Sequence, residues 1–178
     1  MKAVFLGNED ISQIDDDAIE QLKALANQSP NGVARYCLHA SPTDPVQEMV
    51  IYMQTRACTL PHRQVGKRKS YSVLAGSLCV LFFDENKAID RQIILTPAGE
   101  PGPTVLSFKS DTFHTTTCLG HDVAYVETIP GPFRPEETEW VSWISSKKNQ
   151  KEVQEYLQML IDQDSRIGEN WRNQPPAL

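Results

Sequence analysis

The centre of the chain alternates short runs rich in β-branched and aromatic residues with clusters of turn-forming residues. The runs cover residues 48–57, 70–75, 78–84, 90–96, 103–108, 113–118 and 123–129. Residues that favour turns separate them, for example at Gly76-Ser77 and in 97–102. Many short strands at this spacing, with no helical pattern between them, predict an antiparallel β-sandwich or barrel.

Helical periodicity flanks this β-rich centre on both sides. Ala18, Leu22 and Leu25 recur at helical spacing within 15–27, after three aspartates that suit the positive end of a helix dipole. A second apolar stripe lies within 149–163 and consists of Val153, Tyr156, Leu157, Leu160 and Ile161. We expect these two helices to cover the outside or one end of a sheet core.

A length of 178 residues fits one folding unit. We expect 1–47 to form an N-terminal helix and an extended lead-in packed on the barrel, 48–145 the barrel, and 146–178 a C-terminal helix and tail. The tail from 169 to 178, with two prolines and few apolar residues, is expected to be frayed. The first residues lack the long apolar core of a signal peptide. No segment approaches the ~20 apolar residues of a spanning helix, so we expect a soluble, cytoplasmic protein with no membrane partner.

Charge and cysteine spacing exclude two further classes. The net charge is −6, and the densest basic cluster is only 67–69, so nucleic acid is a poor candidate partner. The cysteines form neither a CxxC pair nor a compact zinc spacing; they are Cys37, Cys58, Cys79 and Cys118. We expect reduced thiols that pack as small hydrophobes.

The histidines are part of the one group of residues in the sequence that suggests a chemical site. His62 and Gln64 are two residues apart and would share a strand face, as would Lys69 and Tyr71 on the next strand. His114 opens a later strand. Taken alone, a histidine in a strand is more often a hydrogen-bonded structural residue than a ligand.

Several short stretches resemble a known family in combination. They are RYCLH at 35–39, DPVQEM at 44–49, PHRQVGK at 61–67, VLAG at 73–76, VLFFD at 80–84, FHT at 113–115 and PGPF at 130–133. Over roughly residues 15 to 145 the chain is similar to cupins of the WbuC family, which is associated with bacterial surface-polysaccharide gene clusters. The resemblance implies a mainly β fold, a cupin-type double-stranded β-helix (jelly-roll) barrel, with a site in its mouth.

The resemblance also implies a degenerate metal site. His62 matches the first metal ligand of the cupin pattern and His114 the last, whereas Gln64 stands where a second histidine is expected and Lys69 where a glutamate is expected. A divalent Zn, Fe, Ni or Mn ion, if bound, would be held by His62, Gln64 and His114. Deprotonating the lysine at neutral pH costs about 4–5 kcal/mol, which lowers metal affinity by about three orders of magnitude. We therefore expect no cofactor.

Two interpretations of Lys69 stay open. In the first, its stem packs in the barrel while its ammonium reaches solvent or pairs with a carboxylate. In the second, Lys69, with Lys67 or Arg63, replaces the charge of the metal and receives an anionic ligand. Gln64 and Tyr71 would add hydrogen bonds to the same ligand.

Two interpretations of His39 also stay open. It either approaches the mouth of the barrel as a ligand-binding residue or braces a loop, and we prefer the second.

Three functions remain in competition. The leading prediction is a non-catalytic or weakly catalytic protein that binds a small polar or anionic metabolite, a sugar or nucleotide-sugar derivative by family association. The second is an isomerase or epimerase that uses His62 or His114 as general base and Lys69 or Tyr71 as its electrophilic partner. The third is a metal-dependent enzyme with a reduced ligand set.

The exposed edges of the expected sheets also favour a homodimer.

Overall fold

In the computed structural model, residues 2–6, 11–55, 57–144 and 150–163 are described. They form a mainly β structure with two helices, α1 (Asp16–Asn27) and α2 (Gln150–Gln163). Both helices lie where the periodicity predicts them. No helix in these ranges is long and apolar enough to cross a membrane. The expected frayed tail, 169–178, lies outside the described residues.

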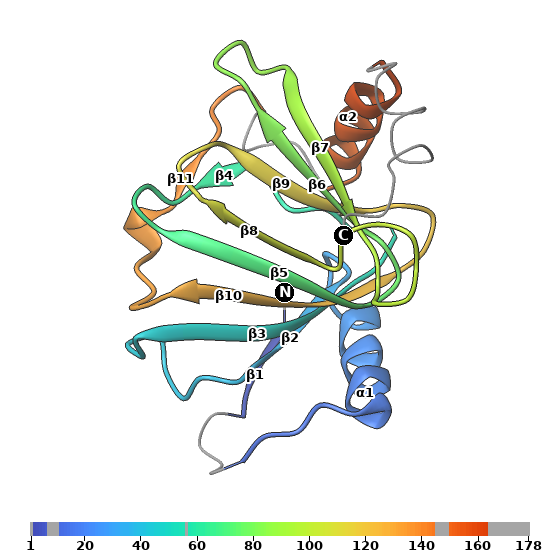
Figure 1. Ribbon diagram of the computed structural model, residues 1–178, viewed down its shortest axis with the longest axis vertical. Helices are drawn as coiled ribbons and strands as arrows, with labels where there is room; N and C mark the ends of the chain where they lie inside the picture. Colours follow the sequence, from blue (N-terminus) through green and yellow to red (C-terminus); the bar gives the residue numbers. More distant parts are fainter. Residues whose placement is uncertain (1, 7–10, 56, 145–149, 164–178) are drawn as a thin grey trace.

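The strands form two sheets (Figure 1). The first sheet runs in the order β1 (Lys2–Phe5), β2 (Val33–Cys37), β3 (Val46–Met53), β10 (Val123–Pro130), β5 (Arg68–Ala75) and β8 (Val105–Lys109). The second runs β11 (Glu139–Trp140), β4 (His62–Arg63), β9 (His114–Cys118), β6 (Leu78–Phe83) and β7 (Ile89–Leu95). All neighbours pair antiparallel except β1 and β2, which are parallel. Across the described ranges these sheets are open, so the expected closed barrel is not confirmed.

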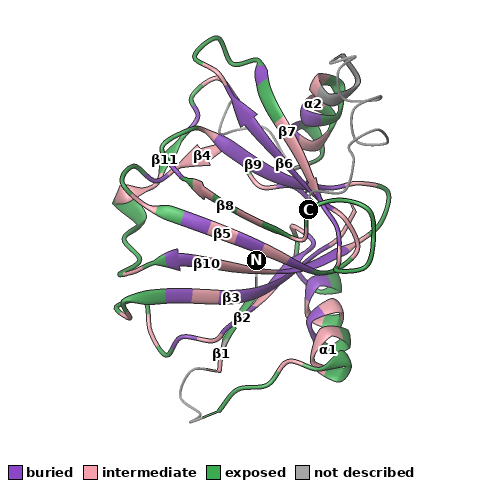
Figure 2. Ribbon diagram, in the orientation of Figure 1, coloured by how far each residue is buried: buried purple, intermediate pink, exposed green. Residues whose placement is uncertain are grey.

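The core lies between the two sheets because each contributes alternate apolar side chains to it. Met53, Val73 and Tyr125 come from the first sheet, and Val80 and Phe82 from the second. Every residue of β6 is buried, as Figure 2 shows. The reason is that its inner side chains enter this core while Cys79, Leu81 and Phe83 pack under Val153 and Leu157 of α2.

Helix α1 covers the outer face of the first sheet. Asp15 caps its first turn by accepting a hydrogen bond from the backbone N–H of Ala18. Leu22 and Ala26 pack on Tyr36 of β2 and Val50 of β3. The expected lead-in, 1–47, therefore contributes two strands as well as a helix. The alternation in 2–5 and 33–37 is too short to have predicted them.

The chain passes the end of both sheets after β10. Residues 131–141, which we call the end strap, contain a 3-10 turn at Pro135–Glu137 and strand β11. Figure 1 shows this segment running from the end of β10 past β5 to its place beside β4. The backbone N–H of Val141 then donates to the carbonyl of Pro61. The end strap thus lies beside the strand that carries His62.

Candidate functional site

His62 and His114 meet on neighbouring strands of the second sheet. They are register partners on β4 and β9, and their ring centroids lie 4.7 Å apart. His114 is fully buried, whereas His62 is half-buried, with Trp140 of the end strap 5.2 Å away, ring to ring. Phe108 stands edge-on to His114 at 4.8 Å. The sequence pattern placed both histidines at strand starts, and the structure brings the two rings together.

Both imidazoles are oriented by backbone carbonyls. Nδ1 of His62 lies 2.9 Å from the carbonyl oxygen of Leu60, and Nδ1 of His114 lies 2.9 Å from that of Thr112. A carbonyl only accepts, so each Nδ1 carries the hydrogen and, in the neutral ring, each Nε2 is an acceptor. No group in the described part of the chain donates to the buried Nε2 of His114.

An ion pair lies beside the two rings. Lys69 of β5 places its Nζ 3.0 Å from Oε1 of Glu127 on β10 and 3.3 Å from Nε2 of His62. The Lys69 side chain is 2% exposed and that of Glu127 15%. The ammonium therefore donates to a carboxylate and to an imidazole at once. We call His62, His114, Lys69 and Glu127 the histidine–lysine site.

Burial and the neighbouring ammonium keep both imidazoles neutral. Burial, followed by the charge of Lys69, lowers the pKa of His62 to about 4. The same two causes, with His62 as a third, lower the pKa of His114 to about 2. Burial raises the pKa of Glu127, but the charge and hydrogen bond of Lys69 outweigh it, so the pKa of Glu127 lies below its ordinary value. At neutral pH the site therefore holds one cation, one anion and two neutral rings.

Tyr71 lies behind the ion pair. It is the register partner of Glu127, its ring centroid is 5.8 Å from Nζ of Lys69, and its ring meets Tyr125 edge-on. Burial, followed by the charge of Glu127, raises the pKa of Tyr71 well above its ordinary value. Its hydroxyl therefore stays protonated.

Arg63 contacts the end strap instead of the ion pair. Its guanidinium donates twice to Oε2 of Glu139, at 2.9 and 2.7 Å, and lies 4.7 Å from the ring centroid of Phe113. Since successive strand residues point to opposite faces, Arg63 projects away from the face that carries His62.

Gln64 and Lys67 also contact the end strap. Gln64 is buried, and its amide nitrogen lies 3.3 Å from the hydroxyl of Thr138. Lys67 donates to Oε2 of Glu137 at 2.9 Å and to the carbonyl of Pro132 at 3.1 Å. Three residues predicted to bind a ligand thus make contacts that fasten the segment beside the site.

His39 forms a hydrogen bond to the first sheet. Its Nδ1 accepts a hydrogen bond from the backbone N–H of Glu48, on β3 of the first sheet. This contact joins the loop that precedes β3 to that strand, which is the kind of contact that the bracing alternative expects.

The side chains at the site do not fit the metal that the resemblance implies. Within the described ranges no three histidine, cysteine, aspartate or glutamate side chains are close enough to share an ion. The ammonium of Lys69 instead lies between an imidazole and a carboxylate, which are the groups a metal would need. An ammonium has no lone pair to offer and repels a cation.

Glu127 is the site residue that the sequence reasoning missed. A signal was present, because Glu127 is two residues from Tyr125 and two from Ile129 in a strand of period two. Both neighbours are buried. A lone glutamate on the apolar face of a strand needs a partner inside.

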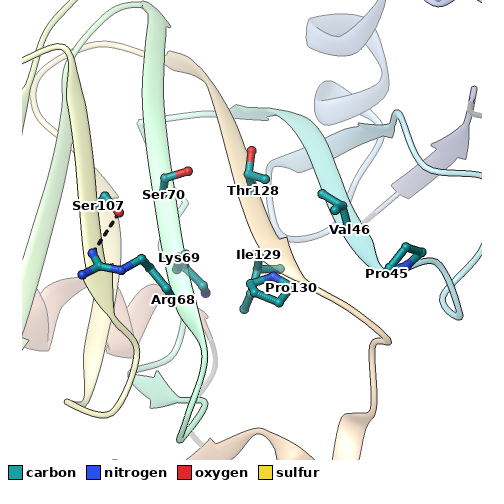
Figure 3. Close-up of a pocket in the computed structure, with 9 residues that line it drawn as sticks. All are labelled: Pro45, Val46, Arg68, Lys69, Ser70, Ser107, Thr128, Ile129 and Pro130. Atoms are coloured by element: carbon teal, nitrogen blue, oxygen red, sulfur yellow. Dashed lines mark hydrogen bonds between the residues drawn. The ribbon is translucent and has the colours of Figure 1, made fainter.

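An open pocket of about 310 Å³ lies on the outer face of the first sheet (Figure 3). Arg68, Ser70 and Thr128 line it, and the Arg68 guanidinium donates to the hydroxyl of Ser107. Lys69 also borders it, but its ammonium turns inward to Glu127. The pocket and the histidine–lysine site therefore lie on opposite faces of β5.

Comparisons with known proteins describe the chain only in part. A family described as a domain of unknown function (DUF6016) matches residues 14–95, which is fewer than half of the 178 residues. No curated protein matches the chain.

Among solved structures, KdgF from Halomonas sp. is 16% identical, with 61% of this chain and 86% of that chain covered and a TM-score of 0.45. The capsular polysaccharide assembling protein CapF from Staphylococcus aureus is 17% identical, with 61% and 31% covered and a TM-score of 0.47. Protein SO0799 from Shewanella oneidensis is 12% identical, with 66% and 75% covered and a TM-score of 0.49. This chain thus spans about a third of CapF. With TM-scores below 0.5, these likenesses establish neither a family nor an activity.

Proposed function

We propose that this chain is a cupin-type jelly-roll protein that binds a small polar metabolite at the histidine–lysine site. The strand order supports the fold. Strands β3 to β10 divide into the sets β3-β10-β5-β8 and β4-β9-β6-β7, an arrangement that suits an eight-stranded jelly roll built from two Greek keys. His62 and His114 then stand at one end of the roll, beside the end strap.

One observation carries the binding proposal: the Nε2 of His114 is a buried acceptor to which no group in the described residues donates. Leaving such an atom unpaired costs about 1–3 kcal/mol. The ring is held in place by its bond to Thr112 and by the edge-on contact with Phe108. A rigid acceptor in an apolar wall suits a ligand donor, because polar groups of this kind fix the orientation of a bound small molecule.

The positive charge at the histidine–lysine site is that of the Lys69 side chain. The Lys69 ammonium lies between His62 and Glu127. It can donate to a ligand oxygen, as a metal would attract one. The sugar or nucleotide-sugar identity of the ligand rests on the family resemblance.

Because His114 is fully buried and the ring of Trp140 in the end strap lies 5.2 Å from that of His62, we propose that a ligand enters when the end strap moves. Two of the contacts that fasten it are ion pairs, Arg63 with Glu139 and Lys67 with Glu137. The first lies at the surface, where ion pairs contribute little to stability. We propose that the end strap opens by releasing β11 from β4, while the other strands of the two sheets keep their pairing.

A second candidate function is acid–base catalysis on the bound metabolite. It is favoured by the 3.3 Å distance between Nζ of Lys69 and Nε2 of His62. A donor and an acceptor at hydrogen-bond distance can each exchange a proton with a substrate. Tyr71 would contribute a neutral hydroxyl, since its pKa is raised by burial.

The test is a binding screen with a matched pair of variants. Neutral sugars, sugar acids and nucleotide sugars are titrated calorimetrically into wild type, His114→Gln and His121→Gln, the last being an exposed loop histidine. We expect at least one compound to bind wild type and His121→Gln equally, and His114→Gln at least tenfold more weakly. Binding by none of them, or binding that ignores His114→Gln, overturns the proposal. NMR spectra of the same mixtures over time detect turnover.

A further inference from the structure

The positive charge of Lys69 is already compensated inside the protein. Its ammonium lies 3.0 Å from the Glu127 carboxylate, and both side chains are largely withdrawn from solvent. An anionic ligand that reached Lys69 would also approach Glu127, and in surroundings of low dielectric that repulsion is strong. The pair therefore presents a dipole rather than a free cation.

The two imidazoles add acceptors, not donors. Each Nδ1–H is used by a carbonyl, so both Nε2 atoms offer lone pairs. The Nε2 of His62 faces the ammonium of Lys69, which leaves that of His114 as the acceptor without a donor. A carboxylate or phosphate oxygen has no hydrogen to give it, whereas an alcohol hydroxyl has one.

A buried hydroxyl occurs at the same end of the sheets. Ser110 is fully buried, and its Oγ has no hydrogen-bond partner among the described residues. Its backbone bonds to Gln64 and Lys67, close to the start of β5. A serine hydroxyl donates and accepts equally well, which again suits alcohol groups.

We propose that the histidine–lysine site takes an uncharged, hydroxyl-bearing ligand of the neutral sugar or polyol class, and that Glu127 excludes the corresponding acid. One ligand hydroxyl donates to Nε2 of His114. This inference rests on the proposed function and narrows its ligand class. It also makes Glu127 the specificity-determining residue of the site.

Matched pairs of probes separate charge from shape. Methyl glucoside and methyl galactoside are compared with the methyl glycosides of glucuronate and galacturonate by calorimetry at neutral pH. The proteins are wild type, Glu127→Gln and Glu48→Gln. Glu48 is the control because it lies on the neighbouring strand β3 and accepts a hydrogen bond from Thr128, on the outer face of the same sheet.

We expect wild type to bind a neutral glycoside at least tenfold more tightly than its acid. Glu127→Gln keeps an oxygen for Lys69 and removes the negative charge, so the ratio of the affinity for the acid to the affinity for the neutral glycoside should rise at least tenfold. Glu48→Gln should behave as wild type. Tighter binding of the acid by wild type, or no gain in Glu127→Gln, overturns this inference and leaves the proposed function standing.

An NMR measurement on the wild-type protein tests the proposed contact with His114 without any variant. The imidazole ¹⁵N spectrum resolves Nδ1 and Nε2 of His114, and acceptance of a hydrogen bond moves the Nε2 resonance. We expect the neutral glycoside to move it and the acid not to. A bound neutral glycoside that leaves this resonance in place overturns the proposed contact. If none of these four glycosides binds, and no other compound of the screen binds either, the proposed function fails together with this inference.

Discussion

Nζ of Lys69 lies 3.0 Å from Oε1 of Glu127 and 3.3 Å from Nε2 of His62, so one ammonium joins a carboxylate of the first sheet to an imidazole of the second. The link crosses the core between β5, β10 and β4 at the end where the chain turns into the end strap. A charge in this position needs its partner, because burying an uncompensated charge is far more costly than burying the pair.

Removing Lys69 alone should destabilise the protein strongly. Lys69→Met leaves Glu127 buried without its cation, which costs about 3–5 kcal/mol when one partner of a buried pair is removed. Adding Glu127→Gln should recover part of this loss, because a neutral amide is easier to bury than a lone carboxylate. Urea unfolding of the two single variants and the double variant measures this coupling. Strictly additive effects would show that the ion pair is not formed in solution.

Stability should fall in mild acid because of the two histidines. Their pKa values in the folded state are about 4 for His62 and about 2 for His114, against about 6.5 in the unfolded chain. Between these values the unfolded chain binds more protons than the folded chain, so stability is full above about pH 6.5 and is lost as the pH falls below it. Each histidine contributes up to about 1.4 kcal/mol per pH unit.

The loss continues below pH 4.5, where Glu127, whose pKa is lowered by Lys69, begins to bind protons in the unfolded chain. Denaturant unfolding between pH 4 and 8 gives the slope. His114→Gln should flatten it, and His121→Gln, in an exposed loop, should leave it unchanged. A flat profile in wild type would mean that the imidazoles are hydrated rather than buried.

How much of this site the sequence could predict depends on the kind of contact. Period two placed Lys69 and Tyr71 on one face of a strand, and both are buried on that face. The resemblance to cupins paired His62 with His114, which are register partners. Each of these inferences uses spacing along one strand or a motif of known geometry.

Contacts between strands that are distant in the sequence could not be predicted from it. Glu127 belongs to a strand that is far from Lys69 in the sequence, and no local pattern fixes the register between β5 and β10. The same holds for Arg63 and Lys67, whose partners Glu139 and Glu137 lie in the end strap. Short strands such as 2–5 escaped as well, because four residues give too little periodicity to separate from a loop.

Loosening the end strap should change access to the site more than stability. Glu137→Gln with Glu139→Gln removes the two ion pairs that join the end strap to Lys67 and Arg63. We expect faster amide hydrogen exchange at Thr138 and Val141, whose N–H groups bond to Pro135 and Pro61, and faster association of any ligand found in the screen. Amides of β6, which is buried on both faces, serve as the internal control. Uniform acceleration across β6 would instead indicate global destabilisation.

Replacing the ammonium by a carboxylate should create a metal site. Lys69→Glu removes the cation between His62 and Glu127 and supplies anionic oxygens beside two imidazole acceptors. Because an ammonium repels a metal ion and a carboxylate binds one, we expect the variant to bind Zn²⁺ or Mn²⁺ about a thousandfold more tightly than wild type. Gln64→His should add less, since Gln64 follows β4 and its amide bonds to Thr138. Arg68→Glu makes the same change of charge on the exposed face of β5 and should bind no metal at the site. Calorimetric titration of these proteins with the metal decides the point. Equal affinity of wild type and Lys69→Glu would show that Lys69 never opposed a metal. Equal affinity of Arg68→Glu and Lys69→Glu would show that net charge alone, and not the geometry of the histidine–lysine site, controls binding.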